Sequence, residues 1–170
     1  MSDPFANPKP LIDRVYAYIA YVVGDPTIAE DVTSEAIARG LRYRASYDHR
    51  KGTPVAWLIG IARNCLPAAA PPFADEAALA DVASAEDVEL EALDRLTLRT
   101  AVASLPARDR ELIALRYGSD LTARQIAGLL ETTTNAVEVA LHRALRRLRA
   151  ELSVEPAEAP RKGLDLAGGM

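Results

Sequence analysis

The side chains best suited to chemistry gather near the C-terminal end of this sequence, at helical spacing. Thr134, Asn135 and Glu138 fall on the outward side of one predicted helix turn, and arginines follow along the later turns. Short polar side chains suit the edges of DNA bases, and arginines suit phosphates. The predicted DNA-contacting residues are Arg124, Gln125, Thr133, Thr134, Asn135, Glu138, His142, Arg143 and Arg146. An ordinary helical hairpin with a basic, solvated face is the alternative.

The sequence contains no residue pattern typical of covalent catalysis. His49 and His142 lie far apart, Cys65 is the single cysteine, and neither a glycine-rich phosphate loop nor a nucleophile elbow is present. Cys and His spacing typical of metal sites is also absent. We therefore expect no enzyme, no catalytic residue, no metal, no cofactor and no small-molecule substrate.

The DNA-contacting residues must be positioned by two helices joined by a tight turn. Thr122 and Gln125 have the spacing of a capping box, and Leu121 and Ile126 that of a hydrophobic staple. Residues 131–133 predict the turn, with Thr133 capping the second helix. The predicted inner faces consist of Ile126, Ala127, Leu130, Val137, Ala140, Leu141, Ala144, Leu145 and Leu148. This arrangement predicts a helix-turn-helix.

Other helices are expected before this hairpin. Apolar residues at spacings of three and four predict helices over 11–23 and about 28–43, the latter with Val32, Ala36, Ile37 and Leu41 inward. Thr53 and Pro54 predict the N-terminus of a third helix, which ends before Pro67. Further helical segments are expected from about residue 88, one of them opened by Pro106. The fold class is therefore all-α.

Charge divides the chain into blocks. Within a net charge of −4, residues 9–64 carry +2, residues 65–94 carry −8 and residues 95–151 carry +4. We predict two small helical domains, 9–66 and 88–152, joined by a flexible acidic Ala/Pro linker (67–87) and followed by a disordered tail (153–170). No secretory signal or spanning apolar run is visible, so we expect a cytoplasmic protein without membrane insertion.

Both blocks resemble a known family. The stretch Leu105-Pro106-Ala107-Arg108-Asp109-Arg110-Glu111-Leu112, with residues 115–117, 125–127 and 136–144, resembles region 4 of extracytoplasmic function (ECF) sigma factors of the sigma-70 family. Gly24-Asp25-Pro26 with Ala29-Glu30-Asp31 resembles the junction of regions 2.1 and 2.2. Residues 57–64 resemble the aromatic-led helix of regions 2.3 to 2.4. The likeness covers about 11–65 and 92–152.

The resemblance implies partners and roles. It implies promoter recognition and DNA-templated transcription initiation, through core RNA polymerase (β′ clamp helices and β flap) and promoter DNA, with an anti-sigma factor as a further candidate partner. Polymerase binding would fall to Asp31, Ser34, Glu35, Ala38 and Arg39. Capture of the single-stranded −10 element would fall to Tyr47, His49, Arg50 and Lys51, and the −35 element to the helix-turn-helix.

One departure from the family pattern concerns region 2.4. Members of the family usually continue this helix with basic residues, whereas Cys65-Leu66-Pro67 and an Ala/Pro run follow here. Proline ends a helix, and no cation remains there for phosphates. Two alternatives stay open: a helix-turn-helix regulator that acts without core polymerase, and a degenerate sigma-like protein that titrates an anti-sigma factor. Transcription with core polymerase alone separates both from a sigma factor.

The acidic block, residues 65–94, leads to a testable prediction. Its eight carboxylates would repel DNA along the same path, which suits a segment lying in the basic channels of the polymerase. We expect deletion of the acidic stretch, or its replacement by Gln and Asn, to impair initiation in a run-off assay with core polymerase. Unchanged transcription from the neutralised chain would remove the idea.

Overall fold

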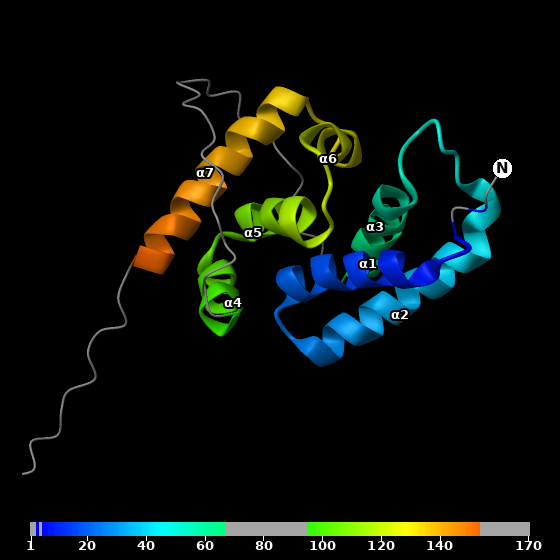
Figure 1. Cartoon of the computed structure of the whole chain (residues 1–170), viewed down its shortest axis with the longest axis horizontal. Helices are drawn as coiled ribbons and strands as arrows, with labels where there is room; N and C mark the ends of the chain where they lie inside the picture. The colour runs from blue at the N-terminus through cyan, green and yellow to red at the C-terminus, as the bar shows by residue number, and fades with distance from the viewer. Residues whose placement is uncertain (1–2, 4, 67–94, 154–170) are drawn as a thin grey trace, which may run out of the picture.

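The computed structural model describes residues 3, 5–66 and 95–153, and every regular element in these ranges is helical. Residues 67–94, which hold the predicted linker, and 154–170, which hold nearly all of the predicted tail, lie outside the described residues. The prediction of an all-α fold is confirmed for the described part. Helices α1 to α3 form one unit and α4 to α7 form the other (Figure 1).

The first unit is an antiparallel helix pair with a third helix packed on it. Its elements are α1 (Pro8–Val23), α2 (Pro26–Tyr43), the short 3₁₀ turn η1 (Arg44–Ser46) and α3 (Pro54–Cys65). Each of the three α-helices has proline in its first turn, where the missing N–H costs nothing. The predicted end of the third helix before Pro67 agrees with α3.

Local caps fix where these helices begin and end. Gly24 ends α1 in the left-handed conformation (φ 78°), which suits glycine. The Asp25 carboxylate then accepts hydrogen bonds from the backbone N–H groups of Thr27 and Ile28, at 2.8 and 3.1 Å. The second helix therefore begins at Pro26, slightly earlier than the predicted Ile28. The predicted Thr53 cap is confirmed, since its hydroxyl accepts from the N–H of Ala56 at 3.3 Å.

The inner face of α2 differs from the prediction at one position. Val32 and Ala36 are buried and Ile37 is half-buried, as expected, but Leu41 is 55% exposed. Gly40 faces α3 instead, and a Cβ there would come within 2.4 Å of the Leu58 side chain. The next residue along a helix points about 100° away, so Leu41 turns to solvent.

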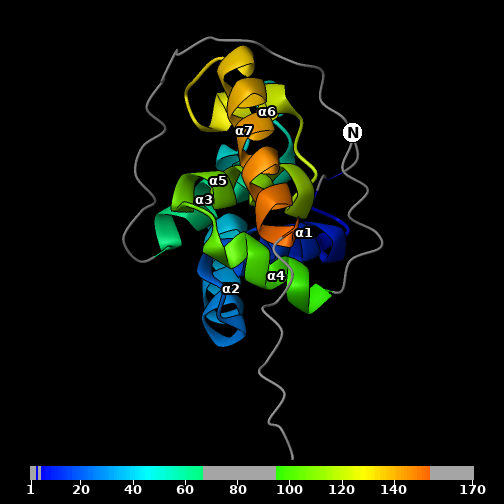
Figure 2. The same ribbon diagram turned by 90° about the vertical axis from the view of Figure 1, so that its left-hand side faces the viewer.

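The second unit carries the predicted helix-turn-helix. It contains α4 (Arg95–Ser104), α5 (Ala107–Ile113), η3 (Ala114–Gly118), α6 (Ala123–Leu129) and α7 (Thr134–Ser153). As expected, a helix follows Pro106. Leu112 and Ile113 of α5 are buried, and so is Leu115 of η3. Helix α7 crosses α4, α5 and α6, so it holds the unit together (Figure 2).

A widened helical turn ends the α5 segment. Over η3 the backbone follows a π-helix, and the N–H of Ser119 bonds to the carbonyl of Ala114 at 3.0 Å. Asp120 then adopts a positive φ of 54°. The chain turns over residues 118–120, and the middle residue of this turn, Ser119, is completely buried.

Two apolar clusters stabilise the described residues. The smaller lies within the second unit and joins α4, α5 and α7 through residues such as Val102, Ile113 and Leu148. The larger is shared, because Val15 and Ile19 of α1 belong to the same cluster as several residues of α5, η3 and α6. The two units therefore lie directly against each other.

A buried carboxylate also ties α5 to α7. The side chain of Asp109 is 8% exposed and accepts a hydrogen bond from the guanidinium of Arg147, which is itself 57% exposed. A carboxylate with so little access to water is costly unless a charged donor pairs with it. Arg147 therefore has a structural partner on α5.

This ion pair leads to a matched stability prediction. Arg147→Ala leaves Asp109 buried without its cation, so we expect the free energy of unfolding to fall by about 1–2 kcal/mol, less than for an entirely buried pair because Arg147 is half exposed. Its exposed neighbour Arg146 provides the control, and Arg146→Ala should cost less than about 0.5 kcal/mol. Urea unfolding followed by circular dichroism measures both; equal losses would contradict the structural role of Arg147.

Candidate nucleic-acid interface

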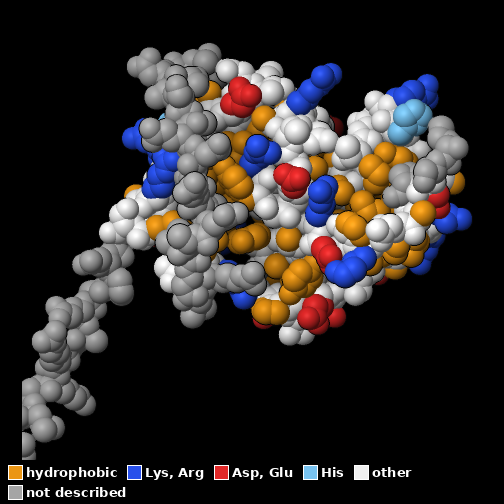
Figure 3. All heavy atoms as spheres, in the orientation of Figure 1, with side chains coloured by type: hydrophobic (Ala, Val, Ile, Leu, Met, Phe, Trp, Pro, Cys, Tyr) orange, Lys and Arg blue, Asp and Glu red, His pale blue; other side chains and the backbone are white. Residues whose placement is uncertain are grey.

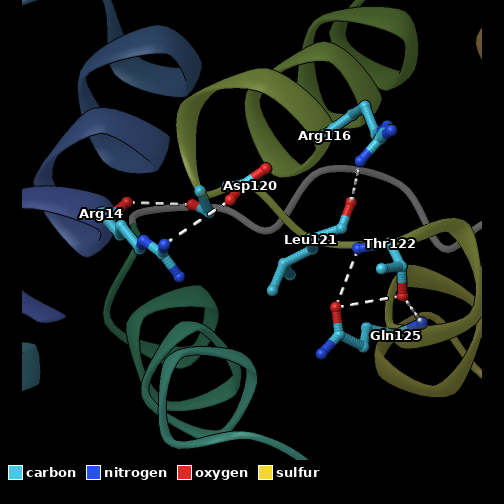
Figure 4. A network of polar contacts seen from close by, with 7 residues as sticks. Arg14, Arg116, Asp120, Leu121, Thr122 and Gln125 are labelled. Carbon is cyan, nitrogen blue, oxygen red and sulfur yellow. Dashed lines mark hydrogen bonds and ion pairs between the residues drawn. The ribbon is translucent and has the colours of Figure 1, made fainter.

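The start of α6 is fixed by a reciprocal cap. The N–H of Thr122 bonds to the Gln125 side-chain oxygen at 2.8 Å, and the N–H of Gln125 bonds to the Thr122 hydroxyl at 3.3 Å (Figure 4). Leu121 and Ile126, which flank this cap, are both buried. The predicted capping box is thereby confirmed, and the predicted staple residues both lie in the core.

The turn between α6 and α7 is short and is held by backbone and cap hydrogen bonds. Glu131 adopts a positive φ of 54°, and the N–H of Thr132 bonds to the carbonyl of Ala127 at 3.0 Å. The hydroxyl of Thr133 accepts from the N–H of Ala136 at 3.1 Å, which confirms Thr133 as the cap of α7. This turn fixes the direction in which α7 leaves α6.

Helix α7 separates an apolar face from a polar one. All the predicted inner residues of the hairpin are buried except Ala140, which is half-buried. Thr134, Asn135 and Glu138 are exposed on the first two turns of α7, as predicted. The N-terminal end of the helix thus presents short polar side chains, while its inner face is held by the rest of the unit.

Cationic groups border this polar tip. Arg124 on α6 and Arg146 on α7 are exposed, while His142 and Arg143 are half-buried. Figure 3 shows some Lys and Arg side chains at the edge of the molecule along which α7 runs, and others spread over the rest of this face. Two of the predicted contact residues, Gln125 and Thr133, are already engaged in helix caps. Both therefore help to hold the hairpin in shape.

The predicted −10 loop lies at the far end of the first unit. His49, Arg50 and Lys51 are exposed, and Arg50 pairs with Asp48 at 3.1 Å. Hydrogen bonds from Arg50 lower the pKa of the Asp48 carboxyl. Neither η1 nor α3, the elements on either side of this loop, packs extensively against α7.

Tyr47 belongs to an aromatic group. Its ring lies 5.4 Å from that of Phe5 and 5.6 Å from that of Trp57, measured between ring centroids, and Phe5 and Trp57 are 5.7 Å apart. Its hydroxyl donates to the carbonyl of Gly52 at 2.9 Å. Trp57 is half-buried in the core cluster, and the contribution of Phe5 had no periodic signal in the sequence.

The predicted polymerase-binding residues share one side of α2. Asp31, Ser34, Glu35 and Ala38 are exposed, and Arg39 is half-buried and hydrogen-bonded to Glu35. This hydrogen bond and the nearby carboxylate raise the pKa of Arg39. A solvated polar face with one intrahelical ion pair results.

Sequence reasoning missed a buried polar network between the units. Glu111 of α5 is 5% exposed, and its Oε1 accepts from the Tyr18 hydroxyl at 3.0 Å and from Nε of Arg63 at 2.8 Å. Burial, together with the negative charge of Glu111, raises the pKa of Tyr18 well above its usual range, so the hydroxyl stays protonated and donates. Tyr18 lies three residues after Val15 on the apolar side of α1, a weak signal that names no partner.

The described residues contain neither a cluster suited to a metal ion nor a helix suited to a membrane span. No group of three or more His, Cys, Asp or Glu side chains in the described ranges is arranged to hold a metal ion. No helix within these ranges has the length and apolar character needed to cross a membrane.

Comparison with known proteins assigns both units. The family model for sigma-70 region 2 matches residues 9–66, and that for sigma-70 region 4 matches residues 95–148, together about two thirds of the chain. The ECF RNA polymerase sigma factor BldN of Streptomyces coelicolor is 32% identical over 145 residues, which cover 80% of this chain and 55% of BldN.

Other relatives carry the same description. The ECF sigma factor SigD of Mycobacterium tuberculosis is 39% identical over 70 residues, covering 41% of this chain and 33% of SigD. The ECF sigma factor SigK of Mycobacterium ulcerans is 28% identical over 146 residues, covering 80% and 78%. The chain thus spans about half the length of BldN and a third of SigD.

A solved structure shares the fold. The sigma factor RpoE of Bartonella quintana, in complex with the anti-sigma factor NepR, superposes with a TM-score of 0.63 at 18% identity, covering 86% of this chain and 94% of that one. Both family models match in the order that the sequence predicted, and the curated relatives share one description. The chain therefore belongs to the sigma-70 family, in its extracytoplasmic function group.

Proposed function

We propose that this chain is an RNA polymerase specificity subunit that directs promoter recognition and starts DNA-templated transcription. The observation that carries the proposal is the geometry of α6 and α7: a capped hairpin with a polar helix tip and a cationic flank, in the same chain as a unit of the region 2 family. The role is one of positioning in the cytoplasm, without covalent chemistry of its own.

The −35 element would be read by the N-terminal end of α7. Thr134, Asn135 and Glu138 are exposed there and suit base edges in the major groove, where an Asn pairs with adenine and a carboxylate accepts from cytosine. Arg124, His142, Arg143 and Arg146 flank this tip and suit phosphates. Gln125 and Thr133, through their caps, would hold the reading helix at the right angle.

The −10 element would meet the loop after η1. His49, Arg50 and Lys51 are exposed and suit the backbone of a single strand, while the half-buried ring of Tyr47 offers a face for stacking. Because Tyr47 is held by Phe5 and Trp57, the stacking face would be fixed before DNA arrives. Helix α3 ends at Cys65, so we assign the first unit little reading of duplex DNA.

Core polymerase would bind the outer face of α2 through its β′ clamp helices and the second unit through its β flap. The exposed row formed by Asp31, Ser34, Glu35 and Ala38, with the paired Arg39, suits a polar protein interface. An anti-sigma factor is a further proposed partner, since the related fold of RpoE was solved in complex with one.

Transcription with purified core polymerase tests the proposal. We expect the chain to start run-off transcription from a subset of a promoter library with no other sigma factor present. Combining Asp31→Lys with Glu35→Lys should reduce this activity at least about tenfold, because reversed charges oppose docking. A control, Glu151→Lys, reverses the charge of an exposed acid of α7, away from α2. If the chain binds promoter DNA in a gel-shift assay but never supports transcription, it would instead be a regulator that acts without core polymerase.

Two substitutions separate base reading from phosphate binding. Asn135→Ala should relax the preference at one base pair of the −35 element, at a cost of about 1–3 kcal/mol for the preferred sequence. Arg146→Ala should weaken binding to all sequences alike and reduce the slope of log affinity against log salt by about 1. Binding of holoenzyme to duplex variants at several salt concentrations measures both. Identical effects of the two substitutions would contradict this division.

A further inference from the structure

Three aromatic side chains meet at the base of the loop that follows η1. Phe5 comes from the segment before α1, Tyr47 from the start of the loop and Trp57 from the first turn of α3. Their ring centroids lie 5.4 to 5.7 Å apart, and each ring contacts the other two. Aromatic pairs attract each other at such distances when the rings are tilted or edge-on. Because α1 and α2 are antiparallel, the segment before α1 reaches the loop that follows α2 (Figure 1).

The position of Phe5 is fixed by a turn. The Asp3 carboxylate accepts a hydrogen bond from the N–H of Phe5 at 2.9 Å, and the Asp3 carbonyl accepts one from the N–H of Ala6 at 3.0 Å. An aspartate that bonds to the backbone two residues further on defines a turn and gives the segment one direction. The match to sigma-70 region 2 begins at residue 9, so the family model does not include this turn.

Tyr47 closes the loop that is proposed to meet the −10 strand. Its hydroxyl donates to the carbonyl of Gly52 at 2.9 Å. Burial, together with the charge of Asp48, raises the pKa of Tyr47, so the hydroxyl stays protonated and donates. Within the loop, the Asp48 carbonyl accepts from the N–H of Lys51 and its carboxylate from the N–H of Arg50, each at 3.0 Å. The cations at the tip of the loop are therefore carried by a turn whose base is closed by one tyrosine.

The ring of Tyr47 depends on Phe5 for its position. Its aromatic neighbours among the described residues are Phe5 and Trp57, so removing Phe5 leaves Trp57 alone to restrict the ring. A change of rotamer at Tyr47 would carry its hydroxyl away from Gly52 and open the loop. Tyr47 is only half-buried, so part of it still faces water while Phe5 is in place. A loop that is ordered before the strand arrives lowers the entropic cost of binding.

We propose that Phe5, oriented by Asp3, is a positioning residue of the single-strand site: it holds the ring of Tyr47 and thereby keeps the loop of residues 47–52 closed. The inference rests on the proposed function and extends the −10 site to a segment that precedes the region 2 match. Phe5 acts through Tyr47, while the strand itself meets the loop. Loss of the Phe5 ring therefore weakens binding of the single strand and leaves the α7 surface unaffected.

Two pairs of substitutions separate the ring from its turn. Phe5→Ala removes the ring, and Phe5→Tyr, which retains a ring, is the conservative variant that should restore the behaviour of the parent chain. Asp3→Ala removes the acceptor of the turn but leaves Phe5 present. Asp3→Asn removes the same negative charge and keeps a side-chain oxygen that can accept from the N–H of Phe5. The difference between the two Asp3 variants therefore measures the turn, free of any effect of charge on DNA affinity.

Trp57 reports on the cluster directly, because it is the only tryptophan in the chain. We expect the Trp57 fluorescence of Phe5→Ala to shift to longer wavelength and to be quenched more by acrylamide, since the indole gains contact with water. Asp3→Ala should change it in the same direction, and Phe5→Tyr and Asp3→Asn should stay close to the parent. Identical emission and quenching in the parent and Phe5→Ala would overturn the proposal, because Phe5 would then not contact the cluster in solution.

The effect on DNA is measured with holoenzyme formed from each variant and core polymerase. The probe is a fluorescent single strand with the −10 sequence of a promoter that the parent transcribes, and a scrambled strand gives the background. We expect Phe5→Ala to weaken binding of the −10 strand about fivefold and Phe5→Tyr to restore it. Asp3→Ala should weaken this binding more than Asp3→Asn does. Binding of a −35 duplex should stay within about twofold of the parent for every variant, because that surface is distant and shares no partner with Phe5.

The outcomes separate this inference from the proposed function. Unchanged binding of the −10 strand by Phe5→Ala would overturn the positioning role alone. Tighter binding would also overturn it, since Phe5 would then cover the Tyr47 ring. Equal losses on the −10 strand and the −35 duplex would overturn it as well, because they indicate a general loss of structure. A parent chain that supports no transcription with core polymerase would overturn the proposed function, and this inference with it.

Discussion

Glu111 sets the constraint on which the arrangement of the two units depends. Its carboxylate is almost fully removed from water, and a buried carboxylate is tolerated only where charged or hydroxyl donors replace the lost hydration. Both donors, Tyr18 and Arg63, belong to the first unit. The second unit therefore cannot keep Glu111 buried by itself. It either docks on α1 and α3 or returns this side chain to water.

The π-helical turn determines where the second unit contacts α1. Widening the helix at η3 moves Gly118 and Ser119 against α1, where one contributes a bare backbone and the other a hydroxyl to the Arg14 carbonyl. The following residues, Leu121 and Thr122, begin the recognition hairpin. The interface and the start of α6 are thus separated by only a few residues. Because only four residues lie between η3 and α6, the position of η3 restricts where α6 can begin.

What the sequence could predict was local. The Thr122 and Gln125 cap, the Thr133 cap and the Thr53–Pro54 helix start all depend on atoms within four residues, and each is confirmed. Leu41 was wrongly placed inward because apolar spacing does not reveal that Gly40 allows α3 to come close. The family motifs predicted both units and their order, which the family models confirm.

The hydrogen-bond network at Glu111 could not be predicted from local sequence patterns. Its partners lie 93 and 48 residues away along the chain, so no local spacing connects them. A Glu directly after Arg110 on a helix is typical of a solvent-exposed face. Only the tertiary fold buries Glu111. The same holds for Tyr47, whose contact with Phe5 depends on a segment that precedes the first helix.

The strength of the contact between the units is set by opposing contributions. Each exposed ion pair at its edge, such as Arg14 with Asp120, contributes at most about 1 kcal/mol, and opening returns Glu111 to water, which offsets the loss of its donors. A difference of about 1.4 kcal/mol changes the open fraction tenfold. Two weak DNA-binding units gain affinity only when tethered to one large partner. A contact of a few kcal/mol between the units can be broken by the binding energy of one larger partner, whereas a much stronger contact would hold the units together permanently.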